Sequence, residues 1–296
     1  LNSTDGSTSV VKATNTYSGT GGLHQVYLGL GWSPFKGFAI GVNAAYLWGD
    51  YSRSVINSYT DAYANTLSKY YTAEVHNYKL DFGMQYTQKI TKNDAITLGV
   101  TYGLGHKLSS DPKCQIISTN AQTAVADTAT YSIGNGLELP HSYGVGLMWN
   151  HANRWRVGAD YTLQKWSSVA YPKFDTSTNS YELVSGQFAD RHKMTVGGEF
   201  CPDERSRSFF KRVHYRMGAS YATDYLKIKG QNGPKEYSVS AGFGIPIVNG
   251  YNNRSLLNIS AQWVRQDSKT FVTENSFRIN IGLTFNERWF AKWKME

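Results

Sequence analysis

The sequence predicts an all-β protein, an antiparallel transmembrane β-barrel of the bacterial outer membrane. Three observations lead to this prediction. Large apolar residues alternate with polar or very small ones over runs of about ten residues, as in Tyr78–Tyr86 and Trp155–Leu163. Aromatic residues gather where these runs meet turns, and the connections alternate between short and long. Each strand thus has one apolar and one polar face, as a barrel in lipid requires.

About eleven strands are predicted from this alternation. A soluble β-sandwich shows the same pattern, but its strands are usually only about five or six residues long. The greater length of the runs therefore favours the barrel. The predicted strands lie near residues 24–33, 37–50, 69–90, 94–107, 139–151, 154–167, 188–201, 208–225, 235–248, 254–267 and 273–286.

The aromatic residues bracket the apolar runs at both ends. Trp32 and Phe38 flank one predicted turn, and Trp149 and Trp155 flank another. At the opposite end lie Tyr46, Trp48 and Tyr51. Aromatic girdles at the two membrane interfaces are typical of transmembrane barrels.

The connections predict which rim faces which side of the membrane. Short turns are expected near 34–37, 89–94, 151–154, 202–207 and 249–253. Longer loops are expected near 51–68, 108–138, 168–187 and 226–234, with one short exception at 268–272. Short periplasmic turns and long extracellular loops are the usual arrangement. The chain is then a single barrel domain, residues 1–296, with 1–23 as an extracellular loop, 24–286 as barrel strands and 287–296 as a periplasmic tail.

Composition argues against several other classes of protein. The chain has no run of 18 apolar residues and a mean hydropathy of -0.44, which excludes a helical membrane span. Its net charge of +8 is scattered and forms no basic stripe, so no nucleic-acid partner is expected. No loop has the spacing of an EF-hand, and neither a metal nor a cofactor is predicted.

No constellation of catalytic residues stands out, so the chain is not expected to be an enzyme. The suggestive neighbours are His141 beside Ser142, and His192 beside Asp190 and Arg191. Their places near strand ends favour solvated rim residues.

The two cysteines offer a test of sidedness. Cys114 and Cys201 fit neither a zinc nor a redox spacing. They are expected on opposite rims and therefore unbridged. Cys114, in a long loop, is expected to react with a membrane-impermeant thiol reagent on whole cells, whereas Cys201, at a short turn, is not.

The number of strands raises a question about completeness. Bacterial single-chain barrels normally have an even number of strands. Eleven strands place the two termini on opposite sides of the membrane. Either an odd number of strands precedes this sequence, or one strand is overlooked within 108–138, where Thr130–Ser132 could be paired.

Three stretches of the sequence resemble the FadL/TodX-type outer-membrane transport proteins, in particular those of Bacteroidetes. They are Gly21–Gly37, Phe38–Gly49 and Leu283–Phe290. The resemblance implies a fourteen-stranded barrel, of which this chain covers the last eleven strands. It also implies an N-terminal plug that gates the passage of hydrophobic molecules.

The resemblance implies a passive transporter for hydrophobic small molecules such as long-chain fatty acids, surrounded by outer-membrane lipid and lipopolysaccharide. The same family includes a shuttle of the type IX secretion system that binds secreted proteins. A protein-binding barrel that contacts secretion-system proteins is therefore the first alternative. A general porin is the second.

Charged residues that alternate with lipid-facing positions are predicted to face the lumen. They form either a charged constriction that guides a ligand or a set of mutually compensating ion pairs. Arg156 and Glu199 are expected to pair. The predicted lumen-facing charges are Lys79, Asp81, Arg156, Asp160, Lys193, Glu199, Arg216 and Arg278.

Two further sets of residues are predicted to serve the lumen. An apolar ligand entry is expected on the loops 51–68 and 108–138, formed by Tyr59, Tyr63, Tyr70, Ile116 and Ile117. Inward-facing glycines indicate either the close approach of a plug or strong curvature of the wall. They are Gly29, Gly31, Gly99, Gly103, Gly105, Gly144 and Gly146.

Overall fold

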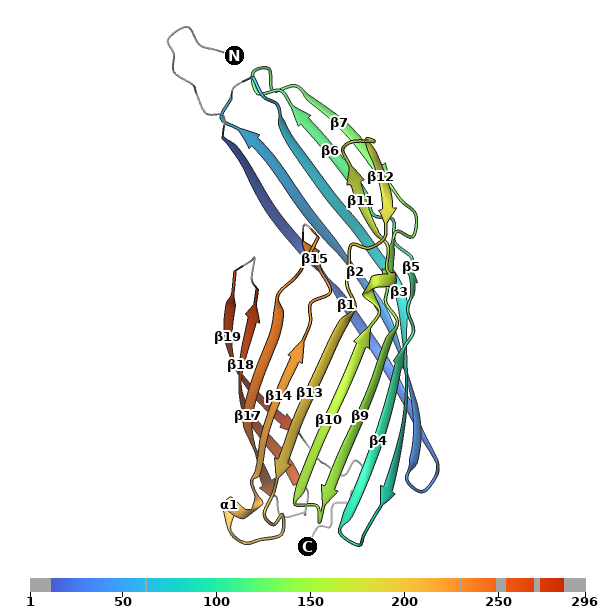
Figure 1. Cartoon of the computed structure of the whole chain (residues 1–296), viewed down its shortest axis with the longest axis vertical. Coiled ribbons are helices and arrows are strands. Elements are labelled where there is room, and N and C mark those ends of the chain that lie inside the picture. The colour runs from blue at the N-terminus through green and yellow to red at the C-terminus, as the bar shows by residue number, and fades with distance from the viewer. Residues whose placement is uncertain (1–11, 62, 229, 249–253, 269–271, 285–296) are drawn as a thin grey trace, which may run out of the picture.

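The structure, a computed structural model, describes residues 12–61, 63–228, 230–248, 254–268 and 272–284. Eleven strands follow one another in chain order across a single antiparallel sheet that curves into a wall (Figure 1). They are β1 (Ala13–Phe35), β2 (Phe38–Tyr59), β3 (Thr66–Lys89), β4 (Asp94–Gly103), β9 (Ser142–His151), β10 (Trp155–Gln164), β13 (Arg191–Phe200), β14 (His214–Ala222), β17 (Lys235–Val248), β18 (Arg254–Asp267) and β19 (Glu274–Thr284). The eleven predicted strands and the antiparallel barrel-type fold are confirmed. Among the described strands, β1 and β19 are the two edges of this path.

The strand register divides the side chains between two faces. On β4, Val100 lies opposite Met84 of β3 and Val145 of β9, whereas Thr101 lies opposite Gly83 and Gly144. We call the face with the large apolar side chains the outer face and the one with small and charged side chains the inner face. The period-two alternation in the sequence is therefore the alternation between these faces.

Tight hairpins join the strands at one end of the wall. The turn between β1 and β2 contains only Lys36 and Gly37, and Gly37 has a φ of +85°, a conformation that favours glycine. At this end the chain also passes from β3 to β4, from β9 to β10 and from β13 to β14. The connections 104–141, 165–190 and 223–234 lie at the opposite end, so the predicted alternation agrees with the fold in part. The exceptions are the connection from β13 to β14, which takes the thirteen residues 201–213, and that from β2 to β3, which takes only six.

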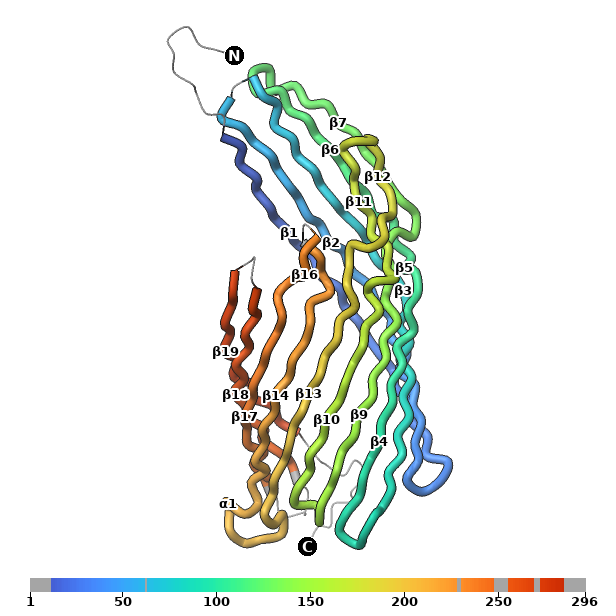
Figure 2. The backbone as a smooth tube through the Cα atoms, in the orientation of Figure 1, coloured from blue at the N-terminus to red at the C-terminus, as the bar shows by residue number. Residues whose placement is uncertain are grey.

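The first three strands project far beyond the others (Figure 2). β3 has 24 residues, which spans about 80 Å at about 3.3 Å per residue, against about 33 Å for the ten residues of β4. The prediction of loops at 1–23 and 51–68 is wrong where the residues are described, because 13–23, 51–59 and 66–68 are strand. Hydrogen bonds link the polar rows here, from Asn57 to Asn15 at 2.7 Å and between Ser18 and Ser54 at 2.6 Å. The tail 287–296 lies outside the described residues.

The predicted loop 108–138 contains a second correction. β6 (Lys113–Thr119) pairs with the upper part of β3, and β7 (Ala126–Ser132) pairs with β6. Thr130–Ser132 are therefore paired, as the alternative interpretation suggested. Because the loop adds a complete hairpin, it contributes two strands, and the parity of the count stays unchanged. Two short strands, β5 (His106–Leu108) and β8 (Leu137–Leu139), pair at its base.

Two other connections contain small elements. The loop 168–187 holds a hairpin of β11 (Tyr171–Asp175) and β12 (Ser180–Val184), preceded by a 3-10 turn at Trp166–Ser168. The connection 223–234 holds a two-residue pair, β15 (Lys227–Ile228) with β16 (Gln231–Asn232). The predicted strand 208–225 begins only at His214, because a short helix, α1 (Phe209–Arg212), precedes it. No helix in the described part of the chain is long and apolar enough to cross a membrane.

Many of the buried apolar residues lie at the long-loop end, and Cys201 and Val213 form a smaller buried group beside α1. The hairpin β11–β12 packs against the inner face of the projecting strands, and Val75 and Cys114 are almost completely enclosed there. Rings of the hairpin meet rings of the wall, with 6.5 Å between the centroids of Tyr71 and Tyr181 and 5.2 Å between those of Tyr131 and Phe174. This contact holds the hairpin against the wall.

Candidate functional site

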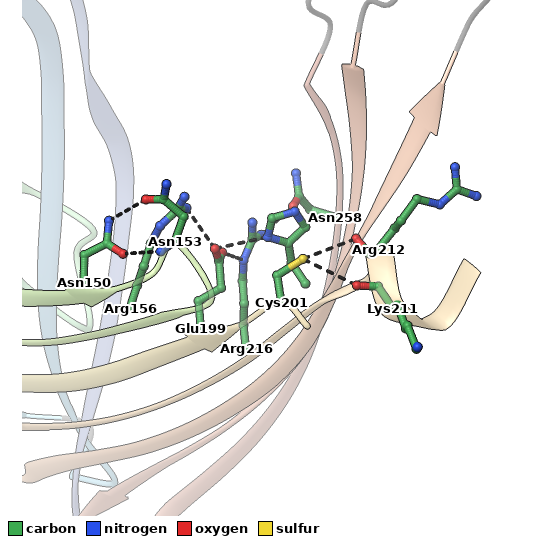
Figure 3. A network of polar contacts seen from close by, with 10 residues as sticks. Asn150, Asn153, Arg156, Glu199, Cys201, Lys211, Arg212, Arg216 and Asn258 are labelled. Atoms are coloured by element: carbon green, nitrogen blue, oxygen red, sulfur yellow. Dashed lines mark hydrogen bonds and ion pairs between the residues drawn. The ribbon is translucent and has the colours of Figure 1, made fainter. Parts of the chain in front are cut away.

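A charged cluster lies on the inner face near the short-turn end of the wall (Figure 3). The Glu199 carboxylate accepts hydrogen bonds from Arg156 Nη1 at 2.9 Å and from Arg216 Nε at 2.6 Å. It also contacts His214 Nδ1 at 3.1 Å. Arg216 extends further and donates to Asn258 Oδ1 at 2.5 Å. The cluster spans four strands, β10, β13, β14 and β18.

The balance of charge in this cluster is positive. Glu199 has a side-chain exposure of 17%, whereas Arg156 and Arg216 each have 38%. One carboxylate therefore lies beneath two guanidinium groups that remain accessible from the lumen. The predicted pair of Arg156 with Glu199 is present. The arrangement allows an anionic group to approach the two arginines, which have donors left over after binding Glu199.

The register places the eight predicted lumen-facing charges on this same inner face. Lys79 and Asp81 form a second ion pair, at 2.6 Å, higher up on β3. Asp160 lies opposite Thr195, and Lys193 lies opposite Thr162. Arg278 lies opposite Gln262 on β18. The eight charges thus divide into one cluster, one separate pair and three further positions, and do not form one constriction.

Opposed glycines open a hollow in the inner face directly beside the Glu199 cluster. Gly99 lies opposite Gly146, and Gly158 lies opposite Gly197, so two pairs of neighbouring positions carry no side chain, with Met148 and Asp160 between the pairs. The resulting open hollow has a volume of about 570 Å³. Its margins are formed by Gln85, Met148, Arg156, Asp160 and Glu199. Volumes of about 300–1,000 Å³ are usual for sites that bind small molecules.

Sequence reasoning missed several members of this site. His214 and Asn258 are absent from the predicted set, although they share the period-two position of Arg216 on their strands. Gly158 and Gly197 were also missed. Their alternation with outer-face residues was visible, whereas their pairing across two strands depends on the register. Of the predicted inward glycines, Gly105 differs, because it follows β4 and donates its N–H to His141 Nδ1 at 3.1 Å.

The predicted ligand-entry residues lie on the projecting part of the sheet but do not form one surface. Tyr59 ends β2, and Tyr63 lies in the following turn with 79% of its surface exposed. Tyr70 and Ile117 share the outer face, whereas Ile116 lies opposite Lys69 on the inner face. These side chains are thus distributed over the tip and both faces.

An ion pair and a hydrogen bond hold the two ends of the connection between β10 and β13 together, at the long-loop end of the wall. Lys165 Nζ binds Asp190 Oδ2 at 2.6 Å, and the backbone N–H of Ser167 donates to Asp190 Oδ1 at 3.0 Å. Partial burial would raise the pKa of Asp190, but the hydrogen bonds from Lys165 and Ser167 outweigh it and lower the pKa to about 2. Asp190 therefore stays ionised at neutral pH and keeps the two ends of the loop together.

The histidines named above take part in rim contacts. His141 Nδ1 lies 2.8 Å from the Tyr102 hydroxyl, and His192 Nδ1 lies 2.7 Å from the Tyr161 hydroxyl. Tyr102 and Tyr161 belong to the outer face. Within the described residues, no group of three or more His, Cys, Asp and Glu side chains is placed to hold a metal ion.

The two cysteines are free, and both are buried. The prediction that no disulfide joins them is confirmed. The expectation that Cys114 is exposed is wrong, because the β11–β12 hairpin covers β6 and the exposure of Cys114 is 0%. Burial also raises the pKa of the Cys114 thiol, which disfavours the reactive thiolate.

We therefore expect neither cysteine of the folded protein to react with a membrane-impermeant maleimide. Cys201, with 2% exposure, should be as protected as Cys114. The measurement is mass spectrometry of intact protein after labelling in vesicles, with a denatured sample as the control for full reaction. Rapid labelling of Cys114 in the folded protein would contradict the packing of the hairpin.

The fold of this curved antiparallel sheet is similar to that of solved hydrocarbon channels and transporters. Of the solved structures, the Ralstonia pickettii toluene transporter TbuX matches with a TM-score of 0.60 and 11% identity over 91% of this chain and 69% of that chain. The CymD monoaromatic hydrocarbon channel matches with a TM-score of 0.53 and 13% identity over 94% and 88%. A Pseudomonas aeruginosa FadL homologue matches with a TM-score of 0.53 and 15% identity over 84% of this chain. The match covers 60% of that homologue, so the chain spans less than two thirds of its length.

The family itself is shown by a sequence model. The BamG family model matches residues 1–296, and the chain belongs to the BamG family. No curated protein sequence matches the chain.

Proposed function

We propose that this chain forms the wall of an outer-membrane passive transporter for hydrophobic small molecules, with long-chain fatty acids as the substrate. The hollow beside the Glu199 cluster is the observation that carries the proposal. Its four glycines leave backbone and apolar carbon at the surface, against which an elongated apolar molecule can lie. The likeness in fold to a hydrocarbon channel and a toluene transporter supports the same class of cargo.

The charged cluster supports the choice of an amphipathic ligand. Arg156 borders the hollow, and Arg216 lies next to it on the other side of Glu199; both keep accessible guanidinium groups. A fatty acid has one carboxylate on a long apolar chain, which matches a hollow with glycine and apolar surface and two neighbouring arginines at one margin. In this proposal the short turns face the periplasm, and a plug segment fills the space along the inner face.

The projecting sheet favours a second candidate, a barrel that binds secreted proteins. β1, β2 and β3 extend well past the other strands, and the upper part of β1 is exposed along its length. An exposed edge strand offers unpaired N–H and C=O groups to an extended peptide. Transport of hydrophobic molecules remains the first proposal because the hollow has no role in such binding.

The test uses full-length protein reconstituted into bilayers, with conductance and binding of a long-chain fatty acid measured on the same preparation. The transporter should bind the fatty acid and conduct ions poorly. Large, steady conductance without binding would indicate a porin instead. Neither conductance nor fatty-acid binding, together with a secreted protein that co-purifies, would favour the protein-binding barrel.

A matched pair of variants tests the hollow itself. Gly146→Phe fills it, whereas Gly198→Phe adds the same ring on the outer face of β13, opposite Val157, where only the backbone of Gly198 borders the hollow. Neither glycine has a positive φ, and a Cβ meets only ordinary contacts of 3.5 Å or more at both. Because overpacking costs about 1–3 kcal/mol, we expect Gly146→Phe to weaken fatty-acid binding roughly tenfold or more. Equal binding by the two variants would place the ligand elsewhere.

A further inference from the structure

The connection between β13 and β14, residues 201–213, combines exposed aromatic rings with basic side chains. Phe209 and Phe210, in helix α1, are 46% and 73% exposed. Their rings meet edge to face at 5.5 Å. The segment contains four basic residues against two acidic ones, Asp203 and Glu204. The basic residues are Arg205, Arg207, Lys211 and Arg212.

Hydrogen bonds fix this segment to the end of the wall. The backbone N–H of Asp203 donates to Lys211 O at 2.9 Å, which closes the segment into a loop. The buried Cys201 thiol donates to the carbonyls of Lys211 and Arg212 at 3.8 and 3.7 Å (Figure 3). The position of the segment relative to the strands is therefore set by contacts on both sides of α1.

A further hydrogen bond places α1 beside the outer face of the wall. The Tyr215 hydroxyl donates to Phe210 O at 3.2 Å. Tyr215 belongs to the outer face, where it lies opposite Phe200 on one side and Phe243 on the other. The row continues to Trp155, whose ring centroid lies 4.2 Å from that of Phe200. An aromatic row at the end of the apolar face marks the membrane interface, so α1 lies at the level of the headgroups.

We propose that residues 205–212 bind anionic phospholipid at this interface, with the two phenylalanines among the upper acyl chains and the cations on headgroup phosphates. Exposed rings next to cations are the composition of interfacial anchors. The proposal rests on the membrane location proposed above. It goes beyond transport, because the site lies outside the lumen and recognises the leaflet at the short-turn end.

The first test measures the depth of an environment-sensitive fluorophore on Ser208→Cys, which leaves both phenylalanines in place. The side chain of Ser208 makes no capping hydrogen bond to α1, and the native cysteines are buried. Spin-labelled lipid should quench this probe, more strongly in vesicles that contain phosphatidylglycerol than in phosphatidylcholine alone. Probes on Asn153→Cys, in another turn of the same rim, and Val239→Cys, on the outer face, are the controls.

The controls separate failure of the anchor from failure of the membrane location. If acyl-chain quenchers reach position 239 while only an aqueous quencher reaches 208, the protein is embedded and the anchor is wrong. If lipid quenchers reach neither position, the membrane location itself fails. Position 153, which has no phenylalanine pair, should be reached mainly by the aqueous quencher.

The second test removes each half of the anchor. In Arg205→Gln/Arg207→Gln/Lys211→Gln, the preference of the Ser208 probe for anionic vesicles should fall on the order of tenfold, since each cation near an anionic surface contributes attraction. In Phe209→Ser/Phe210→Ser, the quenching should fall in both kinds of vesicle. Quenching that is the same in both sets of variants as in the unaltered protein would overturn the proposal. The proposal would also be overturned if the Ser208 probe became shielded from the aqueous quencher only after an acidic protein was added.

Discussion

Val100→Lys should destabilise the protein in a bilayer by about 2–4 kcal/mol, the cost of a lysine on the lipid face near the midplane of a barrel. Val100 lies on the outer face between Met84 and Val145, and a charge there must enter hydrocarbon. The measurement is the free energy of unfolding in denaturant, with the protein folded into lipid vesicles.

Thr101→Lys, one residue along the same strand, is the matched control. Thr101 belongs to the inner face, opposite Gly83 and Gly144, where a long side chain can extend over a small neighbour. Its cost should be much lower than that of Val100→Lys. Equal losses of stability at the two positions would mean that the outer face is not in contact with lipid.

Phe188→Ala should loosen the loop between β10 and β13 and free it from the neighbouring connection 223–234. The Phe188 ring is 8% exposed and lies 5.7 Å from both Trp166 and Tyr171 and 6.1 Å from Tyr225, measured between ring centroids. Removal of a buried phenylalanine usually costs about 3–5 kcal/mol. The lost packing lowers the free energy needed to open the loop locally, and trypsin cleaves the open form. Cleavage at Lys173 should therefore become on the order of a hundredfold faster.

Leu183→Ala is the control for this change. Leu183 lies on the β11–β12 hairpin of the same loop but is 39% exposed, so its truncation removes little packing. Its cleavage rate should stay close to that of the unaltered protein. Unchanged cleavage of Phe188→Ala would show that the aromatic cluster does not hold the loop.

The membrane-embedded strands were predictable because lipid imposes a period of two on them. On β4 the outer positions Ile96, Leu98 and Val100 are all apolar, and the inner positions Thr97, Gly99 and Thr101 are small or polar. In the projecting part of β1 and β2 polar residues occur at successive positions, and this signal disappears. The Ser- and Thr-rich residues 13–23 therefore suggested a loop, although they pair with β2 over their whole length.

The candidate site was predictable in its charges and not in its shape. Arg156 and Glu199 were expected to pair because both alternate with apolar residues near the same ends of neighbouring strands. The uncharged Asn258 has the same periodicity but was not singled out, since amides are common on any inner face. The hollow depends on Gly158 lying opposite Gly197, and only the register of β10 with β13 decides that.

The strictly sequential order of the eleven strands has a consequence for assembly. Each strand pairs with its predecessor in the path, so the sheet can grow by adding one hairpin at a time, without crossover connections. Such neighbouring contacts keep contact order low for a protein rich in strands. A break in the loop between β10 and β13 would leave two arrays of consecutive hairpins, one ending in β10 and the other beginning with β13. Each array retains its own ladders, and the ten paired residues of β10 and β13 are the edge along which the two arrays meet.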